Sequence, residues 1–311
     1  MNAQTIRRQF ADTMLEVGQK DSDLVVVIGD ISHFALQPFA CACPGRFFNI
    51  GICEPASVSL AAGLARMNFH VVLHTISPFL VERCFEQIKL DFCYQQLPGN
   101  LVTVGSAFDF SNLGVTHHCY GDFALLKTLP NVEIVYPGSA REFDVLFRQT
   151  YNNQALTFFR VAAAGHGRDL GLADIALGRG FLARPGRDVT LVATGPHLDT
   201  ALAAADMLTG KSLEAEVIYV HTIRPLDTSL LADSLARTGK VVVIEEHMRS
   251  GGLGDDIIRY FHNDIDFKIA SVSIPDDFVH SYGTYIQQLQ ALDMTPAGLA
   301  NQVLSLCRGK A

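Results

Sequence analysis

The first half of the chain alternates between short apolar runs and longer amphipathic segments. The run Leu24–Asp30, LVVVIGD, is continuous and β-branched, which is typical of a strand buried on both faces of a parallel sheet. Five further apolar runs are predicted to be strands, at 47–51, 70–75, 101–105, 132–136 and 156–161. The predicted helices are 4–19, a small-residue helix after residue 54, 78–95, 118–128 and 139–151. This alternation predicts a doubly wound parallel sheet that binds ligands at the carboxyl ends of its strands.

The pattern breaks at 162–186, which is rich in Gly and Arg and only weakly periodic. We predict a linker at 166–186, between a first domain at 1–165 and a second, smaller α/β domain at 187–311. In the second domain the predicted strands are 189–194, 215–220, 241–245 and 269–274. The predicted helices there are 198–208, 230–237, 253–262 and 286–306. The Gly-rich segment 251–256 permits either a tight strand-to-helix connection or a subunit contact, and we favour the contact.

Composition narrows the class of protein. The chain has 311 residues and a net charge of −8, which argues against a non-specific nucleic-acid surface. No apolar run is long enough to span a bilayer, and the first residues lack the apolar core of a signal peptide, so we expect no membrane association. Seven cysteines without CxxC or zinc spacing predict reduced thiols, a cytoplasmic location and no metal site on this chain.

Glu54 is the strongest candidate for chemistry. It lies at the turn between the predicted strand 47–51 and a helix that begins with Pro55. Taken alone, a carboxylate at such a turn usually caps the helix. The helix behind it contains Ser57, Ala61 and Gly63, whose small side chains allow another backbone to approach closely.

Four other residues are candidates for contact with a ligand at the strand ends. Each of them also has an interpretation in which it only supports the fold. Asp30 closes the first strand and otherwise forms a turn. Phe79 follows the third strand and can cover an aromatic ligand or pack in the core. His117, in GVTHH, can act as a hydrogen-bond donor or proton shuttle, or be a core or surface residue. Arg160 ends the strand LTFFR and requires an anionic partner, from a substrate or from the protein.

The motifs together are more specific than any one of them. FFNIGICEPASVSLAAGLA, SPFLVERCFEQIKLDFCYQ, GVTHHCYGDFALLKTLPNVEIVYPGS and LTFFRV occur in an order and spacing that resembles the transketolase family. TIRPLD and VVVIEEHMRSGGLG extend the resemblance into the second half. It implies the pyrimidine-binding and C-terminal domains of a thiamine-diphosphate enzyme, as in the smaller subunit of a split transketolase.

The resemblance implies roles for individual residues. In similar proteins, a glutamate at the position of Glu54 hydrogen-bonds the cofactor's pyrimidine nitrogen and stabilises the imino tautomer, and an apolar pocket would favour its protonated form. Phe79, Arg83 and Asp30 are expected at the cofactor, and His117 at the substrate or intermediate as a second catalytic residue. Arg160 and Arg7 match arginines that hold a substrate phosphate.

Departures from the family pattern shape the assembly that we expect. Pro55 stands where the family has a glutamine, and VAAAG after Arg160 lacks an extra basic residue. The GDG motif that binds diphosphate and magnesium with a later Asn does not occur. We therefore predict a larger partner subunit that carries this motif, in an α2β2 assembly in which this chain self-associates through both of its domains.

The implied reaction transfers a two-carbon ketol unit from a ketose phosphate to an aldose-type acceptor. Three alternatives stay open: the β subunit of the first component of a 2-oxo-acid dehydrogenase, a deoxyxylulose-phosphate-synthase-like enzyme, and a non-enzymatic scaffold whose cofactor pocket has decayed. THHCYGDFALLKTLPN fits the transketolase side better than the dehydrogenase, and Glu54 argues against the decayed scaffold.

Overall fold

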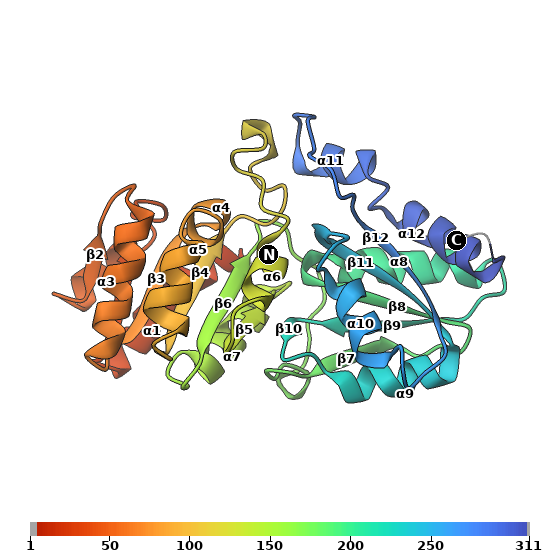
Figure 1. Ribbon diagram of the computed structural model, residues 1–311, viewed down its shortest axis with the longest axis horizontal. Helices are drawn as coiled ribbons and strands as arrows, with labels where there is room; N and C mark the ends of the chain where they lie inside the picture. The colour runs from red at the N-terminus through yellow and green to blue at the C-terminus, as the bar shows by residue number, and fades with distance from the viewer. Residues whose placement is uncertain (1–4, 310–311) are drawn as a thin grey trace.

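The computed structural model describes residues 5–309, which form two α/β domains side by side (Figure 1). The first domain contains a seven-stranded sheet in the order β10-β5-β6-β4-β3-β1-β2, parallel except for β10. Its strands are β1 (Leu24–Ile28), β2 (Phe47–Asn49), β3 (His70–Ile76), β4 (Gly99–Val104), β5 (Val132–Val135), β6 (Leu156–Val161) and β10 (Thr222–Arg224). Every residue of β1 is buried, as the continuous apolar run predicts.

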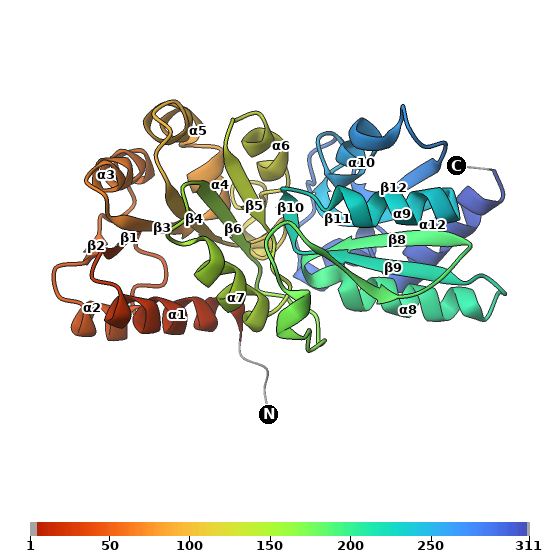
Figure 2. The same cartoon turned by 90° about the horizontal axis from the view of Figure 1, so that it is seen from below.

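Helices cover both faces of this sheet, so the predicted doubly wound class is confirmed (Figure 2). One face is covered by α1 (Ile6–Lys20), α2 (Gln37–Ala42) and α7 (Ala140–Thr150). The other face is covered by α3 (Glu54–Arg66), α4 (Ser77–Val81), α5 (Phe85–Gln87), the π-helix η1 (Ile88–Cys93) and α6 (Asp122–Lys127). The helix predicted at 4–19 begins at Ile6, capped by the Thr5 side chain, and Gln4 lies outside the described residues.

The second domain contains a five-stranded sheet in the order β12-β11-β8-β9-β7, with β7 antiparallel to β9. Its strands are β7 (Gly180–Arg184), β8 (Val189–Thr194), β9 (Ala215–Val220), β11 (Lys240–Met248) and β12 (Lys268–Ile274). Its helices are α8 (Leu198–Thr209), α9 (Thr228–Thr238), α10 (Leu253–Phe261), α11 (Tyr285–Ala291) and α12 (Pro296–Cys307). Short 3-10 turns occur at η2 (Ser111–Leu113), η3 (Leu172–Asp174) and η4 (Gly195–His197).

Several predicted helices are shorter than expected. The helix predicted at 78–95 is divided into α4, α5 and η1, and the carbonyl of Phe79 accepts a hydrogen bond from the Cys84 thiol where α4 ends. The tail predicted at 286–306 is divided because Pro296 can only begin a helix, which Thr295 caps. The helix predicted at 118–128 begins later, at Asp122.

Three short elements escaped the sequence prediction. β7 lies inside the predicted linker 166–186 and pairs with β9, so residues 180–184 belong to the second sheet, which corrects the linker at that point. β10 pairs with β5 and extends the first sheet with a strand from the second half of the chain. α2 lies between the first two strands of the first domain. All three are three to six residues long, so their periodicity is weak.

Buried charges join the two domains. Arg160, on β6, has no exposed surface, and its Nε lies 3.1 Å from Oδ2 of the equally buried Asp122. Its Nη1 donates to the carbonyl of Glu246 on β11 at 2.8 Å, and its Nη2 donates to the carbonyl of Cys119. Burial by itself would lower the pKa of Arg160, but the negative charge of Asp122 raises it above its ordinary value. This guanidinium therefore stays charged and ties β6 to the second domain.

Further polar groups cross the same seam. Glu142, on α7, accepts hydrogen bonds from Tyr219 of β9 at 2.8 Å and from the backbone N–H of Gly138 at 2.9 Å. His247, on β11, donates from Nδ1 to its neighbour's carbonyl at 2.7 Å and accepts from the N–H of Ala124 at Nε2, 3.2 Å away. These contacts hold His247 as the neutral tautomer, and burial lowers its pKa to about 3.

Two findings bear on the class of protein. No helix in the described part of the chain is long and apolar enough to cross a membrane. All seven cysteines are free thiols, as their scattered spacing predicts. Burial raises the pKa of Cys84 to about 12 and that of Cys93 to about 11, so both are poor nucleophiles.

The Arg160–Asp122 pair yields a stability prediction. Asp122→Asn leaves the buried guanidinium without its counter-charge, and we expect it to lower the free energy of unfolding by about 3–5 kcal/mol. Urea denaturation at fixed protein concentration measures this loss. The matched control is Asp169→Asn, at the exposed Arg141–Asp169 pair, which should cost less than about 1 kcal/mol. Equal effects of the two substitutions would contradict the assigned role of Arg160.

His247 yields a pH prediction. Below pH 6.5 the unfolded chain protonates this histidine, whereas the folded chain keeps it neutral down to about pH 3. Its contribution to stability is therefore complete above pH 6.5 and is lost as the pH falls, at up to about 1.4 kcal/mol per pH unit. We expect His247→Gln to flatten the dependence of unfolding free energy on pH between 6.5 and 4.5 by about that slope. Parallel curves for the two proteins would refute the assignment.

Candidate functional site

A groove of about 810 Å³ opens at the carboxyl ends of β1 and β3. Its lining includes Arg7 from α1, Asp30 and Ser32 after β1, Glu54 at the start of α3, and Phe79 from α4. The volume lies within the range of ligand pockets, and the position is the one expected in a parallel α/β sheet. The sheet therefore gathers five side chains that are distant in sequence into one site.

Glu54 is the first residue of α3, and only 2% of its surface is exposed. The N-cap is Cys53, and no side chain caps this helix, so Glu54 is not used as a cap. Its Oε2 accepts a hydrogen bond from Nη1 of Arg83 at 2.8 Å. Its Oε1 has no protein partner within residues 5–309. A buried carboxylate that lines the groove with one uncommitted oxygen is suited to hold a hydrogen-bonding ligand.

Arg83 and Phe79 form the wall beside this carboxylate. The Arg83 guanidinium carbon lies 4.3 Å from the centre of the Phe79 ring, in cation–π geometry. Arg83 is 46% exposed on its side chain, whereas the Glu54 side chain is 3% exposed. We expected an apolar pocket around Glu54. This expectation is corrected, because the Arg83 cation contacts one oxygen of the Glu54 carboxylate.

The loop after β4 brings His117 to the same site. The centres of the His117 and Phe79 rings are 5.1 Å apart, and the rings are in edge-on contact. Nδ1 of His117 is 2.9 Å from Oγ1 of Thr116. The neighbouring His118 is buried instead, and its ring packs against Phe108 with ring centres 5.3 Å apart. Burial lowers the pKa of His118. The two histidines therefore diverge, and His117 is the one near the groove.

Arg7 is held by a buried polar chain. Its Nε donates to Oγ of Ser32 at 2.9 Å, and that hydroxyl is 2.8 Å from Nε2 of His74. Nδ1 of His74 is 2.8 Å from the carbonyl of Val102, and burial lowers the pKa of His74 to about 4. The neutral ring therefore donates to Val102 and accepts from Ser32, which in turn accepts from Arg7. The terminal nitrogens of Arg7 have no partner among residues 5–309.

Sequence reasoning overlooked Ser32 and His74. Ser32 follows Asp30 by two residues at the same strand end, so the rule that ligands bind at strand ends could have identified it. His74 is a polar residue within the apolar strand HVVLHT, and such a residue needs an internal partner.

Of the predicted site residues Asp30 and Arg160, only Asp30 lines the groove. Asp30 lies at the groove with a positive φ of 68°, and it exchanges hydrogen bonds of 3.1 and 3.2 Å with the Asn49 side chain. It is both a turn residue and part of the lining. Arg160 does not line the groove, and its contacts are within the domain seam. Its predicted contact with a substrate phosphate is therefore wrong: Asp122, together with backbone carbonyls, supplies the partner that a buried arginine requires.

Two protein-family models match the chain. The transketolase pyrimidine-binding domain matches residues 2–162, and the transketolase C-terminal domain matches residues 178–299. One of the subunits of the apulose-4-phosphate transketolase of Phocaeicola vulgatus is 32% identical over 277 residues, which cover 88% of each chain. The 1-deoxy-D-xylulose-5-phosphate synthase of Heliobacterium modesticaldum is 31% identical over 284 residues, 88% of this chain and 43% of that protein. The chain thus spans less than half of that synthase.

Solved structures agree with these matches. A split-gene transketolase, an inactive β4 tetramer, superposes with a TM-score of 0.88 at 27% identity, and both chains are covered completely. A transketolase of Pichia stipitis superposes with a TM-score of 0.81 at 15% identity, over 46% of its length, which shows the common fold. The chain belongs to the transketolase family and contains its pyrimidine-binding and C-terminal domains.

Proposed function

We propose that this chain supplies the pyrimidine side of a thiamine-diphosphate site in a split transketolase. With a larger partner it would transfer a two-carbon ketol unit from a ketose phosphate to an aldose-type acceptor. The observation that carries the proposal is the buried Glu54 carboxylate, which has one uncommitted oxygen and lines a groove at the carboxyl edge of the sheet.

The residues present fit the aminopyrimidine part of the cofactor. A pyrimidine ring needs a hydrogen-bonding group in its plane and apolar surfaces against its faces. Oε1 of Glu54 provides the first, and the Phe79 ring lies at the same groove. Arg83 holds the carboxylate from the other side and would fix its orientation. Asp30 lines the groove at the end of β1 and would limit how far a ligand extends there.

When bound, thiamine diphosphate supplies the carbanion chemistry that two-carbon transfer requires. Glu54 would hold the proton that is shared with the pyrimidine nitrogen. His117, beside Phe79, would donate a hydrogen bond to the substrate. Arg7 would bind an anionic group of the sugar with its terminal nitrogens, because Ser32 already occupies its Nε.

The diphosphate and magnesium would be bound by the partner, since this sequence has no GDG motif. We propose an α2β2 assembly in the cytoplasm in which the exposed face of α3, which includes Ser59 and Gly63, lies at a subunit contact. Two similar proteins support the proposal that the cofactor site is divided between two subunits. One is named as a subunit of a transketolase, and the other, a split-gene chain of the same extent, is an inactive tetramer of β chains.

Reconstitution tests the assembly. We expect the isolated chain to show no ketol transfer at any concentration of cofactor and magnesium, because half of the site is missing. Addition of a chain that carries GDG followed by Asn should restore turnover, with a sharp optimum at equal molar amounts. A coupled assay for the aldose phosphate that remains after the ketose donor has lost two carbons measures this. Full activity of the purified single chain would contradict the proposal.

A deoxyxylulose-phosphate-synthase-like reaction is the second candidate, favoured by the similarity to such synthases. The same reconstituted pair distinguishes the two reactions. Release of CO₂ from pyruvate in the presence of an aldose phosphate would support the synthase, whereas transfer from a ketose phosphate without CO₂ would support the transketolase.

Glu54 yields the sharpest test of the site. In the assembled pair we expect Glu54→Gln to lower kcat by about 10²–10⁴-fold, because the amide cannot exchange a proton with the pyrimidine nitrogen. Glu54→Asp should retain more activity, since it keeps the carboxylate but shortens its reach. Glu86→Gln, on the exposed surface of α5, is the matched control and should leave kcat unchanged. Wild-type turnover in Glu54→Gln would exclude this role.

A further inference from the structure

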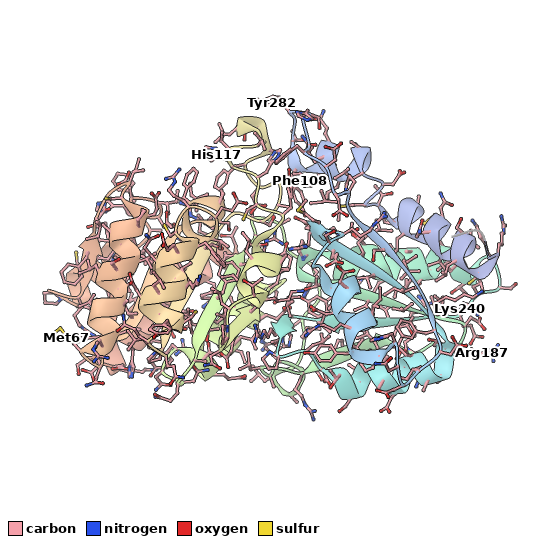
Figure 3. The ribbon with its side chains drawn as sticks, viewed as in Figure 1. Met67, Phe108, His117, Arg187, Lys240 and Tyr282 are labelled. Atoms are coloured by element: carbon pink, nitrogen blue, oxygen red, sulfur yellow. The ribbon has the colours of Figure 1, made fainter. Side chains whose placement is uncertain are left out.

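The loop 106–116 connects β4 to His117 and α6, and it lies between the two domains. Figure 3 shows Phe108 on this loop and His117 directly after it, with Tyr282 of the second domain close to the tip of the loop. His117 contacts Phe79 at the groove, and it also contacts Phe110 of the loop, with ring centres 6.0 Å apart. The position of His117 therefore depends on the conformation of this loop.

The segment before α11 contacts the tip of the loop at two points. Oγ of Ser111 donates to the carbonyl of Gly283 at 2.7 Å. Gly114 is buried beneath the Tyr282 ring, so closely that a Cβ at this position would lie 2.6 Å from Cε1 of the tyrosine. Gly114 also has a φ of +77°, which strongly favours glycine. One edge of the Tyr282 ring thus packs on the loop backbone, while 71% of the residue is exposed.

One buried carboxylate joins the base of the loop to the same segment. Glu246, on β11, is 1% exposed, and its Oε2 is 3.0 Å from Oγ of Ser106, where the loop begins. Its Oε1 accepts a hydrogen bond from the Tyr285 hydroxyl at the start of α11. The backbone carbonyl of Glu246 is the group that Arg160 binds. The seam, the loop base and the start of α11 are therefore held by a single residue.

We propose that residues 281–285 of the second domain are a positioning clamp that sets where loop 106–116 holds His117 against the groove. The clamp rests on the proposed function, and it gives the second domain a part in substrate selection although that domain contributes no residue to the groove lining. Tyr282 and Ser111 are positioning residues in this scheme: they act through His117 and do not touch the substrate.

Hydrogen exchange on the full-length chain tests the clamp independently of catalysis. We expect Tyr282→Ala to raise the exchange of amides in 107–117 by about tenfold, because the ring no longer covers the loop backbone. Tyr282→Phe, which keeps the ring, should match the wild type. Phe278→Ala is the matched control, an aromatic residue on the same connection to α11 with an exposure similar to that of Tyr282, and should leave the loop unchanged. Unchanged exchange in Tyr282→Ala, or an equal rise in Phe278→Ala, would overturn the clamp.

Kinetics on the reconstituted pair test its consequence. We expect Tyr282→Ala to raise KM for the sugar substrates by about five- to tenfold with a smaller change in kcat, since a loosened loop loses preorganised binding. Tyr282→Phe should restore KM. Raised exchange with an unaltered KM would overturn the part in substrate selection. If the wild-type pair transfers no ketol unit at all, the proposed function fails, while the exchange experiment still decides the clamp.

Discussion

The structure depends on a charge that cannot be left unpaired. Arg160 has no contact with water, and an isolated cation in such a place would cost several kcal/mol. Asp122 and two backbone carbonyls balance this cost, and one of those carbonyls belongs to β11 of the other domain. Pairing the guanidinium therefore requires the second domain to lie where it does. The two domains can move little relative to each other along this seam, because any displacement would leave a buried donor or acceptor unpaired.

The rigidity of the seam has consequences for the groove. The residue whose backbone binds Arg160 uses its side chain to hold both the start of loop 106–116 and Tyr285. Domain orientation, loop conformation and the place of His117 are thus coupled through Glu246. Glu54 is positioned differently, by the edge of the parallel sheet and the first turn of α3, and needs no help from the second domain. The site combines one residue fixed by topology with another fixed by the seam.

The sequence predicted those parts of the fold that are determined by the local pattern of apolar residues. Short, mostly apolar runs predicted the central strands correctly, because those strands are buried on both faces. Glu54, Phe79 and His117 were expected near one another because they follow strand ends or belong to one family motif, and the structure brings them together. β7 and β10 could not be foreseen, since each is a short antiparallel edge strand defined by a distant partner.

Arg160 shows where sequence reasoning reaches its limit. A buried arginine at the end of a strand needs an anion, and the sequence allows either a ligand or an internal carboxylate to provide it. Only the tertiary structure reveals that Asp122 does so. The consequence is chemical: with Arg160 sequestered, an anionic substrate group would rely on Arg7, whose terminal nitrogens are uncommitted within the described chain. The neutral His74 orients that guanidinium through Ser32, although His74 itself does not line the groove.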